Sequence, residues 1–171
     1  MKLSSGMETL GLPHAAPSKP AATVYLHAGQ TFVTQEPRQI STIVGSCVVV
    51  LLWSSRFRVG GATHYLLPEW NREGNPSPRY GDIALNDLLT QVLNLGASPS
   101  DLYAHIYGGA NILESLQRMS GGLGLKNVEV ATEWLRKNPR IRLHDRNTGG
   151  KYGRKIVFDT FEGTVTLQEI K

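Results

Sequence analysis

The sequence predicts an α+β fold: a layered α/β sandwich with mixed, largely antiparallel sheets. Segments with the alternation typical of strands outnumber helical segments, and several of them follow one another as hairpins. A doubly wound parallel sheet would instead need a helix after nearly every strand. The chain has 171 residues, 40% of them hydrophobic, so one domain can bury a core without a disulfide or a metal. We expect that domain at residues 23–171, after a disordered tail at 1–22 rich in Pro, Ala and Ser.

Alternation and β-branched residues predict the first strands. β-Branched residues flank Gly45-Ser46, which predicts a strand, a kink at the glycine and then a buried strand. The next strand returns as a hairpin and ends at Pro68, because proline cannot donate to a ladder. The strands predicted here span residues 23–34, 39–53 with the kink, and 59–67.

Capping residues predict the helices that follow. Asp82 is expected to cap a helix that runs to Leu95, with Gly96 as its stop. Asn127 is a plausible cap for a second helix, which must end before Pro139. The remaining predicted elements are a strand running into a glycine turn at 101–111, a short helix at 111–119, and closing strands at 141–147, 155–161 and 164–170.

Composition excludes several classes of protein. Cys47 is the only cysteine, so the chain can form neither an intrachain disulfide nor a cysteine-based zinc cage. The N-terminal segment lacks the apolar core of a signal peptide, and no stretch approaches the roughly 18 apolar residues of a membrane span. We expect a cytoplasmic protein without membrane insertion, metal or cofactor.

Positive charge is concentrated in residues 126–155. This segment holds nine of the eighteen basic residues, opposed by three acidic ones, in a chain of net charge +4. A solvated basic surface is the simplest interpretation. An acidic protein partner comes next, because a cluster of positive charges attracts a negatively charged surface. No nucleic-acid partner is expected, since we find no binding module and no aromatic residues interleaved for base stacking.

The single thiol stands at the mouth of an apolar strand, and His64 lies on the next strand of the same predicted hairpin. An imidazole near a cysteine can take its proton and so produce the nucleophilic thiolate. The kink at Gly45-Ser46 can aim backbone N–H groups at an incoming carbonyl. From spacing alone, a buried inert thiol beside a core histidine stays the alternative.

Several blocks of sequence together resemble the chemoreceptor glutamine deamidases, the CheD family. The resemblance covers roughly residues 23–169 and is carried by STIVGSCVVVLLW, GGATHYLLP, RYGDIALNDLL, IYGGAN, and GLKN followed by DRNTGGKYGRKIVF. It implies hydrolysis of glutamine side chains on methyl-accepting chemotaxis receptors, giving glutamate and ammonia. It also implies a sandwich similar to the catalytic domains of deamidating bacterial toxins, and a CheC-type phosphatase as a partner.

The resemblance places the nucleophile at Cys47 and the base at His64. The family's third catalytic residue, a threonine six positions before the cysteine, falls on Ser41, which keeps the hydroxyl but lacks the methyl that restricts its rotamer. Strand alternation points the neighbouring Thr42 to the opposite face, unless the kink near Gly45 changes the facing. Ser41 is therefore the predicted third catalytic residue, and Thr42 is the alternative. The simplest interpretation is that Ser41 is an ordinary strand residue without a catalytic role.

Glycine turns near the predicted site suggest room for a substrate. We expect Ser46, Gly108, Gly109 and Gly149 to contact it. At the three glycines no Cβ obstructs a close approach. Plain turn geometry would explain the same glycines. Two other functions stay open at this point: a receptor-binding module without catalysis, and a receptor glutamyl methylesterase using the same Cys-His chemistry.

Overall fold

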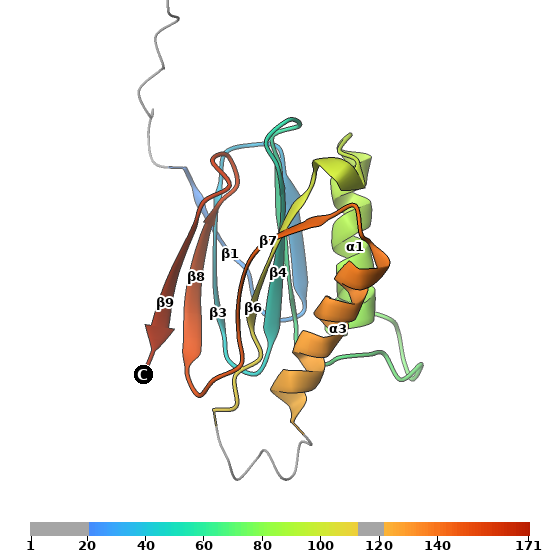
Figure 1. Cartoon of the computed structure of the whole chain (residues 1–171), viewed down its shortest axis with the longest axis vertical. Helices are drawn as coiled ribbons and strands as arrows, with labels where there is room; N and C mark the ends of the chain where they lie inside the picture. Colours follow the sequence, from blue (N-terminus) through green and yellow to red (C-terminus); the bar gives the residue numbers. More distant parts are fainter. Residues whose placement is uncertain (1–20, 113–121) are drawn as a thin grey trace, which may run out of the picture.

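The computed structural model of the chain describes residues 21–112 and 122–171. Nearly all of the predicted tail at 1–22 and of the predicted helix at 111–119 lies outside these residues. Within them the chain forms three layers, in which a five-stranded sheet lies between a four-stranded sheet and a pair of α-helices (Figure 1). This arrangement confirms the predicted α+β fold.

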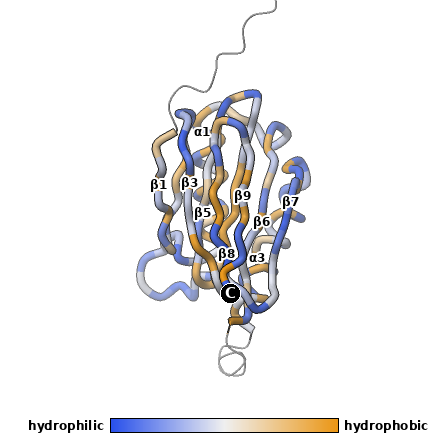
Figure 2. The backbone as a smooth tube through the Cα atoms, turned by 90° about the vertical axis from the view of Figure 1, so that its left-hand side faces the viewer, coloured by the Kyte–Doolittle hydropathy of each residue, from blue (hydrophilic) through white to orange (hydrophobic). Residues whose placement is uncertain are grey.

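The four-stranded sheet forms one outer layer. Its first pair of strands is parallel and the other two pairs are antiparallel. In Figure 2 this sheet faces the viewer, and hydrophilic and hydrophobic positions follow one another along its strands, as expected when one face meets solvent. In order across the sheet, the strands are β1 (Thr23–Tyr25), β3 (Gln39–Val44), β8 (Gly153–Asp159) and β9 (Val165–Ile170).

The five-stranded sheet forms the middle layer. All its pairs are antiparallel except the last, which is parallel and has a register shift at Ala104/His105. The strands are, in order, β2 (Gln30–Thr34), β5 (Val59–Tyr65), β4 (Val48–Ser54), β6 (Tyr103–Gly108) and β7 (Arg142–Thr148).

Two helices, α1 (Gly81–Asn94) and α3 (Leu123–Lys137), cover one face of the middle sheet, and a short 3-10 helix, η1 (Pro99–Asp101), precedes β6. No helix of the described residues is long and apolar enough to cross a membrane. The helices bury residues such as Leu85, Leu88 and Trp134 against Val48, Val50 and Leu52 of β4. Alternate residues of the same strand, Val49 and Leu51, point the other way into the core between the sheets, so β4 is buried on both faces.

The segment predicted as one strand at 23–34 is two strands in two sheets. Its first part, β1, pairs with β3, and its second part, β2, pairs with β5. The chain crosses between the layers at a turn that contains Gly29, whose φ of 83° suits glycine. The three closing strands are also divided between the two sheets: β7 pairs with β6 in the middle sheet, while β8 and β9 form a hairpin in the outer sheet.

Both predicted caps are corrected. α1 begins at Gly81, and Asp82 instead accepts a hydrogen bond from the backbone N–H of Trp70 at 3.0 Å. α3 begins at Leu123, directly after the left-handed Gly122, so Asn127 lies inside the helix. Asn127 is fully buried, and its side chain donates to backbone carbonyls of other segments instead of capping the helix.

Candidate active site

Cys47 lies in the bend at residues 45–47, where the chain leaves the outer sheet at the end of β3 and enters the middle sheet at β4. Its side chain is half-buried and packs against the core between the two sheets. Burial raises the pKa of the Cys47 thiol, and its own backbone N–H acts in the opposite direction. The thiol is therefore protonated at neutral pH, and a nucleophile would need a base beside it.

His64 belongs to β5 and faces the same core. The ladder pairs His64 with Val49, and Cys47 stands two residues before Val49. Because alternate residues of a strand share a face, the thiol and the imidazole lie on the same side of the middle sheet. The structure thus places on one face of the sheet the two residues that the sequence predicts as nucleophile and base.

The Thr42 hydroxyl fixes the tautomer of the His64 ring. The Thr42 hydroxyl donates to the backbone carbonyl of Leu26 at 2.7 Å, and the same Oγ1 lies 2.9 Å from His64 Nδ1. A hydroxyl has one proton, and a carbonyl can only accept, so Nδ1 must donate to Oγ1. The lone pair of the neutral ring is then on Nε2, which is buried and has no hydrogen-bond partner among the described residues.

Burial lowers the pKa of His64 to about 4, from an ordinary value near 6.5. The contact with Leu26 opposes this shift, and the charge of His27 adds to it. At neutral pH the site therefore holds a neutral thiol and a neutral imidazole rather than an ion pair. An unpartnered Nε2 in that state can accept a proton from a nearby thiol.

The structure places Thr42, rather than Ser41, against the imidazole, and this corrects the expectation for Ser41. β3 alternates, with Ile40 and Val44 in the core between the sheets, and Thr42 shares their face. Ser41 points to the other face, and its carbonyl accepts a hydrogen bond from Leu26 N at 2.9 Å. The kink follows at residue 45, so it does not change the facing of Thr42.

Ser46 and Asn127 meet beside the thiol. The Asn127 side-chain amide donates to the backbone carbonyls of Ser46, at 3.0 Å, and Leu66, at 2.9 Å. Sequence reasoning missed this role, because Asn is a favoured N-cap residue and Asn127 lies near the start of a helix. The backbone N–H groups of Ser46 and Cys47 donate to no backbone carbonyl of the described residues.

The glycine turn after β6 packs on the bend that holds the thiol. Gly109 N donates to the Cys47 carbonyl and Ala110 N to the Gly45 carbonyl, both at 2.8 Å. A Cβ on Gly108, where φ is 115°, would lie 2.2 Å from the Cys47 carbonyl oxygen. A Cβ on Gly109 would collide with Val128 and the Gly124 carbonyl. These two glycines are thus required by the protein's own packing, whereas a Cβ on Gly149, where φ is 76°, would meet no other atom within 4 Å.

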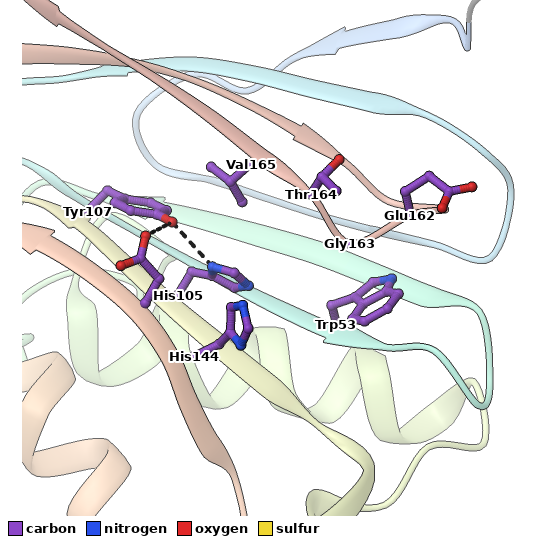
Figure 3. Close-up of a pocket in the computed structure, with 9 residues that line it drawn as sticks. Trp53, His105, Tyr107, His144, Glu162, Gly163, Thr164 and Val165 are labelled. Atoms are coloured by element: carbon purple, nitrogen blue, oxygen red, sulfur yellow. Dashed lines mark hydrogen bonds between the residues drawn. The ribbon is translucent and has the colours of Figure 1, made fainter.

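A cavity of about 570 Å³ opens elsewhere, between β4, β6 and β7 of the middle sheet and the turn that joins β8 to β9 in the outer sheet (Figure 3). Tyr107 donates to Asp145 Oδ2 at 2.8 Å, and its hydroxyl oxygen lies 3.2 Å from His105 Nδ1. The parallel β6–β7 pair also brings His144 to 5.1 Å from His105, between ring centroids. The described residues hold no group of His, Cys, Asp and Glu that could bind a metal ion. The cavity is lined by Trp53, His105, Tyr107, His144, Asp145, Glu162, Gly163, Thr164 and Val165, and so includes neither Cys47 nor His64.

The basic segment 126–155 is less uniform than its sequence suggests. Arg136 and Lys137 pair with Glu133 on the surface of α3. Arg154 is buried, and its guanidinium donates to Asn147 and to the Gly149 carbonyl, both at 2.7 Å. Part of the segment's charge therefore supports the fold instead of a partner surface.

Comparisons with known proteins agree with the resemblance seen in the sequence. A protein of Trichlorobacter lovleyi named probable chemoreceptor glutamine deamidase CheD is 42% identical, over 86% of this chain and 91% of its own. Proteins with the same name from Sulfurimonas denitrificans and Thermococcus kodakarensis are 37% and 40% identical, over 86% and 83% of this chain and 94% and 89% of theirs.

The family model described as CheD chemotactic sensory transduction matches residues 66–169, a range that starts after His64. A solved Neisseria meningitidis structure of the DUF152 family aligns over 77% of this chain and 63% of that chain, with 11% identity and a TM-score of 0.38. It adds nothing to the fold described above. From the family model and the curated relatives, the chain belongs to the CheD family.

Proposed function

We propose that this protein hydrolyses glutamine side chains of methyl-accepting chemotaxis receptors to glutamate, with Cys47 as nucleophile and His64 as base. The observation that carries the mechanism is the buried, unpartnered Nε2 of His64, on the same sheet face as the only thiol. The names of the relatives support the substrate and the reaction.

The first step is proton transfer from the thiol. Because both groups are neutral at rest, His64 Nε2 takes the Cys47 proton as the sulfur attacks the glutamine side-chain carbon. The C–S bond forms, and the carbonyl π electrons move to the oxygen. In the proposed route, backbone N–H groups of the bend stabilise that oxyanion, with the Cys47 N–H as the first donor.

The remaining steps return the enzyme to its starting state. Protonated His64 gives its proton to the departing nitrogen, the C–N bond breaks, and ammonia leaves a thioester on Cys47. His64 then takes a proton from water, whose oxygen attacks the thioester carbon. The thiolate leaves and regains its proton, which releases glutamate. The proposed route needs no metal or cofactor.

Thr42 serves as a positioning residue. It accepts from Nδ1–H and so keeps the lone pair on Nε2, while its donation to Leu26 ties the hydroxyl to the backbone. Ser41 has no contact of this kind. Of the three glycines named from the sequence, Gly108 and Gly109 are held by the protein's own packing, which leaves Gly149 as the candidate for close approach of a substrate.

The test is incubation of purified receptor cytoplasmic fragments with wild-type protein and with Cys47→Ala. Mass spectrometry of receptor peptides should show glutamines gaining about one mass unit with the wild type only, with a matching release of ammonia. Full deamidation by Cys47→Ala would overturn the proposed mechanism. A loss of about fourteen mass units from methylated glutamates would favour the methylesterase, and binding without any mass change would favour an adaptor.

A CheC-type phosphatase is the regulatory partner that the family resemblance suggests. Direct contact would change the deamidation rate of the wild-type protein when the purified phosphatase of the same organism is added. An unchanged rate at saturating phosphatase would contradict regulation of this site.

A further inference from the structure

Asn127 is a polar side chain in an apolar place. It lies within α3, where the helix packs on the middle sheet, and it is fully buried between residues of the helix-side core. A buried amide is costly unless its donors and acceptors are satisfied. A residue of this kind in a core calls for a reason beyond packing.

Only one end of the amide is satisfied. Its Nδ2 donates to two carbonyls, Ser46 O and Leu66 O, while Oδ1 has no partner among the described residues. The assignment of the two ends is secure because carbonyls can only accept, so the NH₂ must face them. The donor end is therefore the part of Asn127 that this site uses.

The two carbonyls belong to the segments that carry the proposed catalytic pair. Ser46 directly precedes Cys47, and Leu66 stands two residues after His64. Tyr65, next to His64, donates from its hydroxyl to the Asn127 backbone carbonyl at 2.5 Å. A single residue of α3 thus connects the bend of the thiol to the strand of the imidazole.

The hydrogen bond to the Ser46 carbonyl also fixes the direction of the Cys47 N–H. Ser46 C=O and Cys47 N–H belong to one planar peptide unit, and the described residues include no cis peptide bond, so the two groups point in opposite directions. Holding the oxygen toward α3 directs the Cys47 N–H away from it. Gly109 N holds the next peptide unit through the Cys47 carbonyl.

We propose that Asn127 is a positioning residue for the oxyanion site: by holding Ser46 O it aims the Cys47 N–H at the oxygen of the substrate amide. The inference rests on the proposed function, in which a tetrahedral oxyanion forms beside Cys47. A misdirected donor would raise the barrier of the acyl-transfer step without removing the thiol, the base or the binding surface.

The test compares two reactions of the same cysteine in Asn127→Asp, which keeps the shape but replaces the donor by an oxygen. Deamidation passes through an oxyanion, whereas alkylation by iodoacetamide is a displacement at carbon that forms none. We expect kcat for deamidation to fall by about 10²-fold, as for a lost oxyanion donor, with KM and the alkylation rate of Cys47 unchanged. Asn138→Ala is the matched control, because Asn138 also donates its amide to a carbonyl of α3, that of Trp134 at 2.8 Å.

Thermal unfolding of each variant shows whether it is folded. Should Asn127→Asp not fold, Asn127→Ser carries the same comparison, since its short neutral side chain cannot hold both carbonyls. Alkylation that slows in parallel with kcat, or a kcat equal to that of the wild type, would overturn the assignment. Failure of the proposed function would give a different result: Cys47→Ala would then deamidate the receptor at the same rate as the wild type.

Discussion

Two buried histidines of this protein are held alike and differ in what lies beside them. His64 donates to the Thr42 hydroxyl, which donates to the Leu26 carbonyl. His105 contacts the Tyr107 hydroxyl, which donates to the Asp145 carboxylate. Burial lowers the pKa of both rings to about 4, and the charge of His144 adds to the shift of His105.

The surroundings separate the two rings. Both rings lie on the face of the middle sheet that meets the outer sheet, but at different distances along β4 from the thiol: His64 pairs with Val49, two residues from Cys47, whereas His105 pairs with Leu51, four residues from it. His105 lies instead among Tyr107, His144 and Phe158 at the cavity of Figure 3. A hydroxyl that fixes the tautomer of a buried histidine is thus a general way of satisfying the ring. It becomes part of a catalytic site only where the free nitrogen has a nucleophile to deprotonate.

The largest expected difference is in catalysis. His64→Ala should lower kcat for receptor deamidation by about 10²–10⁴-fold, the range for a lost general base. His105→Ala should leave kcat near the wild-type value once the fraction of folded protein is taken into account. Comparable losses in both variants would show that the contrast between the two rings has no catalytic meaning.

A smaller difference is expected from the hydroxyls. Thr42→Val keeps the shape but removes the acceptor for Nδ1–H, so His64 can rotate and change tautomer, and kcat should fall by roughly tenfold or more. Ser41→Ala is the control on the same strand, because Ser41 faces away from the ring. Tyr107→Phe is the counterpart at His105 and should not alter kcat. If Ser41→Ala is the damaging change, the assignment of Thr42 is wrong.

The pH profile of deamidation should reflect the buried base. Activity needs neutral His64, whose pKa lies at about 4, so kcat/KM should stay level as the pH falls from 7 toward about 5. A histidine with an ordinary pKa near 6.5 would already lose most of its activity in that range. An acid limb near pH 6.5, measured on protein that is still folded, would contradict the burial of His64.

Stability in acid is where the two rings should behave alike. Both histidines have a lower pKa in the folded state than in the unfolded chain, so the unfolded chain binds more protons between the two values. The free energy of unfolding should therefore be highest above about pH 6.5 and fall as the pH drops toward 4. Urea denaturation at several pH values should show a shallower fall in His64→Gln and in His105→Gln than in the wild type. A fall of unchanged steepness in either variant would contradict its lowered pKa.

The sequence predicted the parts of this molecule that depend on local pattern. The strand before Gly45, the hairpin that pairs Val49 with His64, and α1 follow from alternation, β-branched residues and helical spacing. The shared face of Cys47 and His64 follows from that hairpin, so the central pair was within reach of sequence reasoning. The family resemblance then supplied the chemistry.

The features that the sequence did not predict depend on pairing between distant segments. Nothing local shows that β1 and β2 belong to different sheets, or that β7 pairs with β6. The choice between Ser41 and Thr42 depends on which face of β3 meets the middle sheet, and a one-residue change in facing reverses it. The role of Asn127 needs the carbonyls of Ser46 and Leu66, which come from elements 81 and 61 residues away.

The most direct test of the account is the rate at which iodoacetamide alkylates Cys47 at neutral pH in the wild type, His64→Ala and His105→Ala. The thiol has a raised pKa, so it needs a base to react at neutral pH. We predict that His64→Ala slows alkylation by at least about tenfold and that His105→Ala leaves it unchanged. Equal rates in the wild type and His64→Ala would contradict the account, because His64 would then be a core histidine like His105.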